Sequence, residues 1–222
     1  MSALNTAGPP TYIATGSWFF TPDGNNAAQI VEQDSDHMHF GWWVETPTNA
    51  KSGGEFLYDV HVFHDGTVFQ PTGASRNALT GKATYNGSAA GLYAVKAHMD
   101  DGTSVEATRG EFTADVSLTA DFKTTAAGDV SGTIEDFVRD DGVENTWSLK
   151  LEKTTIVTAS DATTTGISTG SIVSDGENTG QWEYNLYGTG KDNADPTGIA
   201  GRFNSKIGKD TAVAGGFAAT RQ

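Results

Sequence analysis

Strict alternation of apolar and polar residues between Phe112 and Phe122 constrains the fold more than any other feature of the sequence. The apolar members of this run are Phe112, Ala114, Val116, Leu118, Ala120 and Phe122. Successive side chains of a strand point to opposite faces, so these residues share one face and the polar residues between them share the other. The run is therefore predicted to be a long strand with one buried face and one solvated face.

Seven further segments in the second part of the chain have a similar pattern, and turn-forming residues separate them. The predicted strands are Lys82–Ala97, Glu111–Phe122, Asp129–Val138, Thr146–Val157, Gly166–Val173, Gly180–Tyr187, Gly198–Ile207 and Ala212–Thr220. Asp-Gly pairs such as Asp175-Gly176 permit the positive φ of tight hairpins. Strands joined mostly by short connections form an antiparallel meander, which needs its two edges closed or covered. The sequence therefore predicts an all-β fold with an eight-stranded antiparallel up-and-down barrel.

Glycine and aromatic residues alternate on the predicted inward faces of several strands. Gly87 and Gly91 lie between Tyr85 and Tyr93, and Gly201 precedes Phe203 by two residues. Glycine inside a strand weakens it unless the space is needed. We expect rings from across the barrel to occupy that space, which favours a filled interior over the alternative of an open ligand pocket.

Residues 1–79 differ from the rest of the chain, because they contain four of the five histidines and three of the five tryptophans. Their strand-like segments are Ser17–Phe20, Met38–Glu45 and Glu55–Phe63. We interpret residues 1–79 as a small β-rich handle region that packs on a barrel domain formed by residues 80–222.

Composition excludes several classes of protein. Without cysteine, the chain cannot form disulfides, Cys-ligated zinc sites, iron–sulfur clusters or a catalytic thiol. A net charge of -14 argues against binding to nucleic acid or to an anionic membrane. The sequence contains no apolar run of about 18 residues, so it predicts no transmembrane helix. The first ten residues lack the basic and apolar regions of a signal peptide. This absence is expected of a cytoplasmic protein or of a piece of a longer one.

Known catalytic motifs are missing, including a nucleophile elbow, a phosphate-binding glycine loop and a zinc-protease helix. Paired acids such as Asp140 and Asp141 fall in predicted turns, where solvated carboxylates are ordinary. A glycan hydrolase would need two carboxylates inside a cleft, and the predicted inward faces contain none. The chain is therefore predicted not to be an enzyme.

The run Asp36-His37-Met38-His39-Phe40 is the most chemically suggestive part of the sequence. On a strand, His37 and His39 share one face about 7 Å apart, so their imidazoles can bind one metal ion or a haem. The alternative is an exposed polar pair on a strand whose other face is apolar. His61 and His64 are three apart, so they face opposite ways and cannot chelate together. No other cofactor is predicted.

Three tryptophans in this region, Trp18, Trp42 and Trp43, are candidates for contact with a partner. Some of the aromatic residues around them must belong to the core. Any that stay exposed would form the kind of patch that anchors a protein partner.

The run from Leu79 to Tyr93 (LTGKATYNGSAAGLY) resembles the opening of the barrel domain of transferrin-binding protein B and its relatives. Phe112–Phe122 followed by Val130–Ile134 is similar to the next hairpin of that family. The closing strands are similar as well. They include Gly180-Gln181-Trp182, Tyr187-Gly188, Gly198–Phe203 and Val213–Ala219. The resemblance covers residues 79–222 and concerns the scaffold, so it assigns no binding residue.

This resemblance implies a barrel preceded by a smaller β-rich handle, at the surface of a Gram-negative bacterium or secreted from it. It also implies a non-catalytic, solute-binding function, with a protein or small molecule as ligand. Family members are often anchored through a lipidated cysteine, which this chain lacks. One alternative is a structural or adhesive domain of a larger extracellular protein. A second is haem or metal capture through the handle region.

Overall fold

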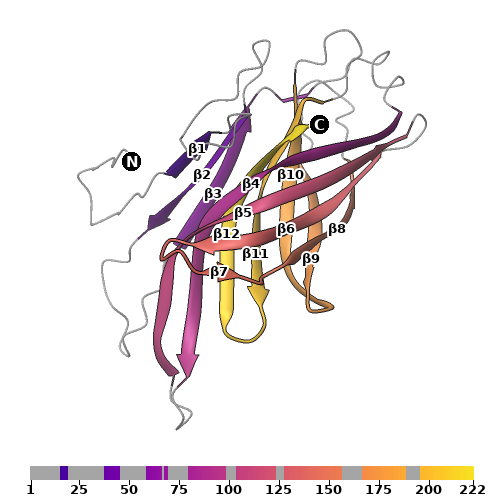
Figure 1. The fold of residues 1–222 in the computed structure, drawn as a ribbon. Coiled ribbons are helices and arrows are strands. Elements are labelled where there is room, and N and C mark those ends of the chain that lie inside the picture. The colour runs from indigo at the N-terminus through magenta and orange to yellow at the C-terminus, as the bar shows by residue number, and fades with distance from the viewer. Residues whose placement is uncertain are drawn as a thin grey trace.

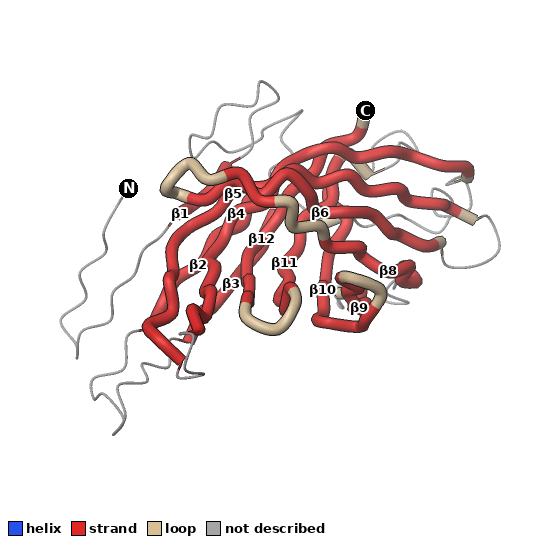
Figure 2. Tube along the Cα trace, turned by 60° about the horizontal axis from the view of Figure 1, so that its bottom comes forward, coloured by secondary structure: helices blue, strands red, loops and turns tan. Residues whose placement is uncertain are grey.

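The computed structural model describes residues 16–19, 38–45, 59–66, 68–69, 80–98, 104–123, 128–156, 167–188 and 196–222. Every regular element in these ranges is a strand (Figure 2). Within the same ranges, no helix has the length and apolar character needed to cross a bilayer. The all-β prediction is confirmed.

Eight long strands form a closed antiparallel barrel (Figure 1). They are β4 (Gly81–His98), β5 (Ser104–Phe122), β6 (Asp129–Arg139), β8 (Leu149–Thr155), β9 (Ser168–Ser174), β10 (Glu177–Tyr187), β11 (Gly198–Ile207) and β12 (Thr211–Arg221). Each strand pairs with the next along the chain, and β12 returns to pair with β4, which closes the sheet. The short strand β7 (Glu144–Asn145) extends the far end of β6. The predicted up-and-down barrel is therefore confirmed.

Several strand boundaries differ from the sequence-based prediction, and the starts of β5 and β8 are the instructive cases. β5 begins at Ser104 instead of Glu111, because β4 and β5 keep pairing beyond Ala94↔Arg109 as a hairpin that projects from the barrel (Figure 1). β8 begins at Leu149, and its register against β6 shifts between Leu151 and Thr154. This bulge turns Thr154 to the buried side, where strict alternation from Leu151 would have placed Lys153.

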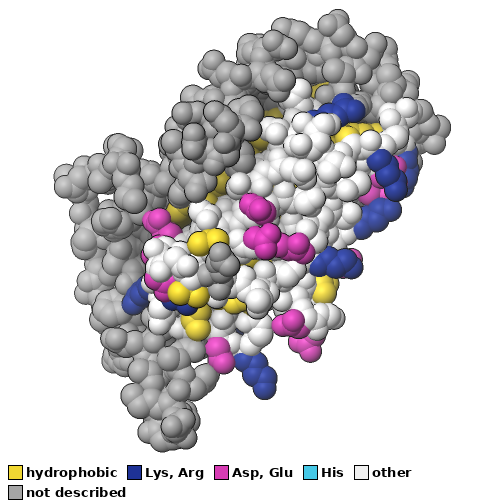
Figure 3. All heavy atoms as spheres, in the orientation of Figure 1, with side chains coloured by type: hydrophobic (Ala, Val, Ile, Leu, Met, Phe, Trp, Pro, Cys, Tyr) yellow, Lys and Arg dark blue, Asp and Glu magenta, His cyan; other side chains and the backbone are white. Residues whose placement is uncertain are grey.

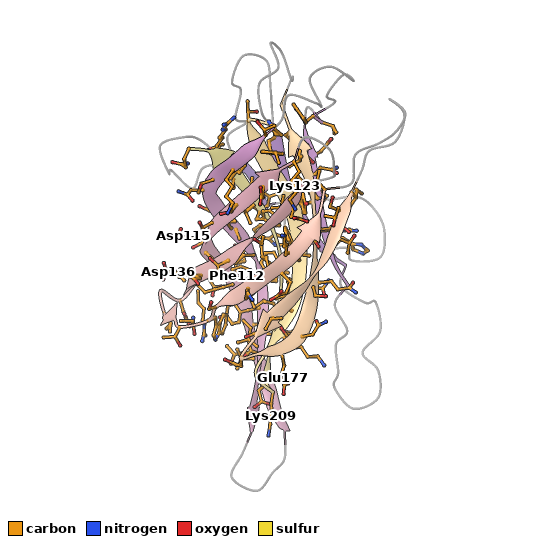
Figure 4. The ribbon with its side chains drawn as sticks, turned by 90° about the vertical axis from the view of Figure 1, so that its right-hand side faces the viewer. Phe112, Asp115, Lys123, Asp136, Glu177 and Lys209 are labelled. Carbon is orange, nitrogen blue, oxygen red and sulfur yellow. The ribbon has the colours of Figure 1, made fainter. Side chains whose placement is uncertain are left out.

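Side chains fill the interior of the barrel. Phe112 packs against Phe137 with ring centroids 5.1 Å apart, and Trp182 stacks on Tyr184 at 4.8 Å. The largest interior side chains are less than 2 % exposed, and they include Trp182, Tyr85, Tyr184, Phe112, Phe137 and Phe217. In Figure 4, the labelled Phe112 belongs to this interior, whereas the labelled Asp115 on the same strand is exposed. The predicted filling of the interior is thus observed, and these rings come from β4, β5, β6, β10 and β12.

The glycines of the wall serve the predicted purpose only in part. A Cβ built on Gly91 would lie 2.5 Å from the Cα atom of Gly215, which is directly opposite on β12. Glycine therefore lets the backbones of adjacent strands approach each other. At other glycines a ring occupies the space. Cζ of Phe217, on the neighbouring strand, lies 2.6 Å from a Cβ built on Gly201, and Cζ of Phe112 on β5 lies 3.1 Å from one built on Gly215. The indole of Trp182 covers Gly170 in the same way.

A second, three-stranded antiparallel sheet is formed by β1 (Gly16–Phe19), β2 (Met38–Glu45) and β3 (Asp59–Gly66), in that order. We call it the small sheet. It lies against the outside of the barrel, next to β11 and β12 (Figures 1 and 2). Elsewhere, the outer wall carries charged side chains of both signs in small groups (Figure 3).

Candidate functional site at the junction of the small sheet and the barrel

The barrel-facing side of the small sheet is apolar. Met38, Phe40 and Trp42 alternate along β2 and are 4 %, 1 % and 0 % exposed. Val62 of β3 pairs with Trp42 and is buried beside it. The period-two pattern predicted from the sequence therefore gives this sheet a real apolar face, and that face is turned to the barrel.

The barrel wall that receives this face is built of very small residues. They are Ala90 of β4, Gly198 and Ala200 of β11, and Gly216 and Ala218 of β12, all buried, and we call them the alanine–glycine strip. A Cβ built on Gly216 would lie 2.5 Å from Cδ2 of Phe40, and one on Gly198 would lie 2.8 Å from Cε of Met38. Small side chains let the two sheets approach until the large rings of β2 rest on the backbone of the wall.

Polar groups complete one side of the junction. Nδ1 of His64 lies 2.8 Å from the Tyr187 hydroxyl of β10. Nε2 of His64 lies 3.7 Å from Oε1 of Glu183, and Nε of Arg202 lies 2.6 Å from that same oxygen. Arg202 also donates from Nη1 to the carbonyl oxygen of Val62 at 3.2 Å. We call His64, Tyr187, Glu183 and Arg202 the junction network, because it links β3 to β10 and β11.

The electrostatics of the junction network favour a neutral His64. Its side chain is 5 % exposed. Desolvation is the largest influence and lowers the pKa of His64; the Glu183 carboxylate opposes this, and the Arg202 guanidinium reinforces it. With the proton on Nε2, towards Glu183, Nδ1 accepts the hydrogen bond that the Tyr187 hydroxyl donates. Burial also raises the pKa of Tyr187, so its hydroxyl keeps the proton it donates.

The opposite side of β3 is more accessible. His61 and Asp65 are exposed and Phe63 is half-buried, so these alternate residues form the outward side of the strand. The predicted opposition of His61 and His64 is confirmed, because Val62 and His64 face the barrel. We call His61, Phe63 and Asp65 the outward face.

The predicted metal ligands are only partly described. His37 lies outside the described residues. His39 belongs to β2, where it pairs with Phe19 of β1 and with Asp65 of β3. The described side chains include no group of three or more His, Asp or Glu that could hold a metal ion. Metal or haem binding at His37 and His39 stays a prediction.

The three predicted partner-binding tryptophans have separate positions. Trp42 is wholly buried against the barrel. The prediction that it belongs to an exposed partner surface is therefore wrong. A partner cannot reach it while the small sheet is in place. Trp18 pairs with Phe40, and Trp43 pairs with His61. The side chains of Trp18 and Trp43 lie outside the described residues, so partner contact there stays a prediction.

Sequence reasoning missed the junction network. Glu183 and Arg202 are directly opposite in the register of β10 and β11, a pairing that sequence spacing cannot reveal. A weaker signal was available for His64, since it follows Val62 by two residues and so shares its strand face.

Comparison of the chain with models of protein families gives no match, and comparison with curated proteins gives no significant similarity. Resemblance to the transferrin-binding protein B family therefore stays a prediction.

Proposed function

We propose that this chain is a non-catalytic binding protein that recognises its ligand on the outside of the barrel. The observation that carries the proposal is that the barrel interior is occupied by the chain's own aromatic side chains. Those rings fill the place where open barrels of this size hold a small ligand. The surface outside the barrel is then the place for recognition.

The small sheet is the best element for that role. One of its sides is committed to the barrel, and the outward face of β3 carries an exposed imidazole, a half-buried ring and an exposed carboxylate. Such a mixture of aromatic and polar groups on a strand that rests on a rigid support is typical of a protein-binding surface. The order of a smaller β-rich region followed by a barrel also agrees with the family resemblance. On that resemblance, we propose a surface-exposed or secreted bacterial protein.

Affinity capture tests this function. Purified chain is immobilised, exposed to host and environmental fluids, and each captured species is purified and measured for saturable binding. We expect His61→Ala with Phe63→Ala to weaken binding at least about tenfold, which corresponds to about 1.4 kcal/mol. The matched control is Lys150→Ala with Glu152→Ala, an exposed ion pair on the barrel strand β8. Binding that is equally strong in both double variants, or chemical turnover of a captured molecule, would contradict the proposal.

A further inference from the structure

His64 is the one described histidine that joins the small sheet to the barrel through its side chain, and its surroundings are polar without being open. From β10, Glu183 and Tyr187 face it, and from β11, Arg202 does. On its own strand, Asp65 adds a weaker influence of negative charge. The residues that β2 and β12 contribute nearby, Phe40, Gly216 and Ala218, carry no charge.

The surroundings of His64 in the docked sheet make its protonation unfavourable. In the tautomer with the proton on Nε2, Nδ1 accepts a hydrogen bond from the Tyr187 hydroxyl, so an added N–H there would face a group that is donating. The Asn185 side chain also hydrogen-bonds the Tyr187 hydroxyl, which limits how that hydroxyl can turn. Oε1 of Glu183 is already bound by Arg202 at 2.6 Å, against 3.7 Å to His64. The carboxylate attracts a charged imidazole, but this attraction only partly offsets the loss of water around a buried His64, and the Arg202 guanidinium opposes it.

We propose that His64 is an acid-sensitive latch, so that its protonation releases the small sheet from the alanine–glycine strip of the barrel. Release would uncover Phe40 and Trp42 on one side and Gly216 and Ala218 on the other. Val68 and Phe69 follow β3 in the chain. They would keep the released small sheet attached to the barrel. Val68 pairs with Tyr187, and the Phe69 amide donates to the Leu186 carbonyl at 2.8 Å. The latch depends on these contacts and not on the proposed binding function, so either can fail without the other.

The direction of the pH dependence follows from linkage. Burial lowers the pKa of His64 in the docked sheet, whereas the released side chain regains an ordinary pKa near 6.5. The released state then binds more protons, so docking is fully stable above that ordinary value and weakens as the pH falls below it. Acidification from about pH 7.5 to about pH 5 spans this window.

The absence of cysteine from the chain makes a direct test possible. Ala218→Cys places a single thiol on the alanine–glycine strip, and Ala219→Cys places one inside the barrel. Both alanines are 0 % exposed. The thiol-labelling rate is measured at both pH values and divided by the rate of the same variant in denaturant. We expect this normalised rate to rise several-fold on acidification for Ala218→Cys and to stay constant for Ala219→Cys.

Two histidine variants assign the effect. Gln at position 64 keeps one donor and one acceptor but cannot be protonated, so His64→Gln should abolish the acid-dependent rise for Ala218→Cys. His61→Gln, on the outward face of the same strand, should leave the rise intact. A normalised rate that does not depend on pH, or a rise that survives His64→Gln, would overturn the latch. If His64→Gln instead labels rapidly at both pH values, an NMR titration of the His64 ring decides. A pKa below 6.5 supports the latch, and a pKa at or above 6.5 overturns it.

Discussion

The barrel interior and the junction of the small sheet are both apolar, but they are held in different ways. Inside the barrel, rings pack on rings within a sheet whose strands are hydrogen-bonded all the way around. At the junction, two separate sheets meet through Met38, Phe40, Trp42 and the alanine–glycine strip, with the junction network at one side. Among the described residues, the segment Val68–Phe69 makes the only backbone-to-backbone hydrogen bonds between the part of the chain that contains the small sheet and the barrel.

This difference indicates two levels of stability in one chain. Opening the barrel breaks ladder hydrogen bonds and exposes many buried rings at once, so its interior should open only when the whole domain unfolds. Opening the junction exposes fewer apolar side chains and breaks few hydrogen bonds. The small sheet should therefore detach at a much lower free energy than the barrel unfolds.

Truncating an interior ring of the barrel should have the largest effect. Phe217 is fully buried, contacts Trp182 with ring centroids 6.3 Å apart, and covers Gly201. Phe217→Ala should lower the free energy of unfolding by about 3–5 kcal/mol, because it leaves a cavity that the closed wall cannot collapse into. Chemical denaturation followed by circular dichroism measures it. A loss below about 1 kcal/mol would mean that the interior is loosely packed.

A matched pair of glycine variants separates the two regions. In Gly216→Ala, the new methyl group meets Phe40 of the small sheet, whereas in Gly201→Ala it meets Phe217 and the wall itself. Overpacking of this kind costs about 1–3 kcal/mol. Gly216→Ala should lower only the free energy of detaching the small sheet, and Gly201→Ala should lower the global free energy of unfolding. Hydrogen exchange of β2 and β3, together with denaturation of the whole chain, distinguishes them. Equal effects of both variants on both measurements would contradict the view that the small sheet detaches separately from global unfolding.

Removing a surface ion pair of the barrel should have the smallest effect. Asp129 accepts hydrogen bonds from Lys123 and Lys153 at 2.7 and 2.8 Å, and these bonds lower its pKa. A carboxylate with a lowered pKa stabilises the fold above its ordinary value of 3.8 and loses that contribution as the pH falls through the folded pKa. Asp129→Asn should therefore slightly lower the denaturation midpoint at neutral pH, and the difference should shrink in acid. A difference that grows in acid would contradict this sign.

The sequence was sufficient for the barrel because one local rule decides each strand. Alternation from Phe112 to Phe122 fixes which residues face inward without any knowledge of the neighbouring strands. The same rule fails at the bulge before Thr154. There the extra residue changes which side chains face inward, and the alternation pattern gives no sign of it.

The junction was less accessible to sequence reasoning, since it depends on the match between two faces far apart in the chain. The pattern of Met38, Phe40 and Trp42 showed an apolar face, but nothing in it showed that the outer wall of the barrel would cover that face. The prediction that Trp42 contacts a partner is wrong for this reason. His64 and Glu183 are 119 positions apart, and only the folded arrangement of β3 and β10 brings them together.

Native-state hydrogen exchange tests the central claim, that the small sheet and the barrel are two separately opening units, most directly. Backbone amides are followed in increasing but sub-denaturing concentrations of denaturant. Amides of β2 and β3 should exchange through an opening with a low free energy and a weak dependence on denaturant, because little surface is exposed. Those of β5 and β12 should exchange only through global unfolding, with the full denaturant dependence. The same free energy and the same denaturant dependence in both sets would show one cooperative unit and contradict the account.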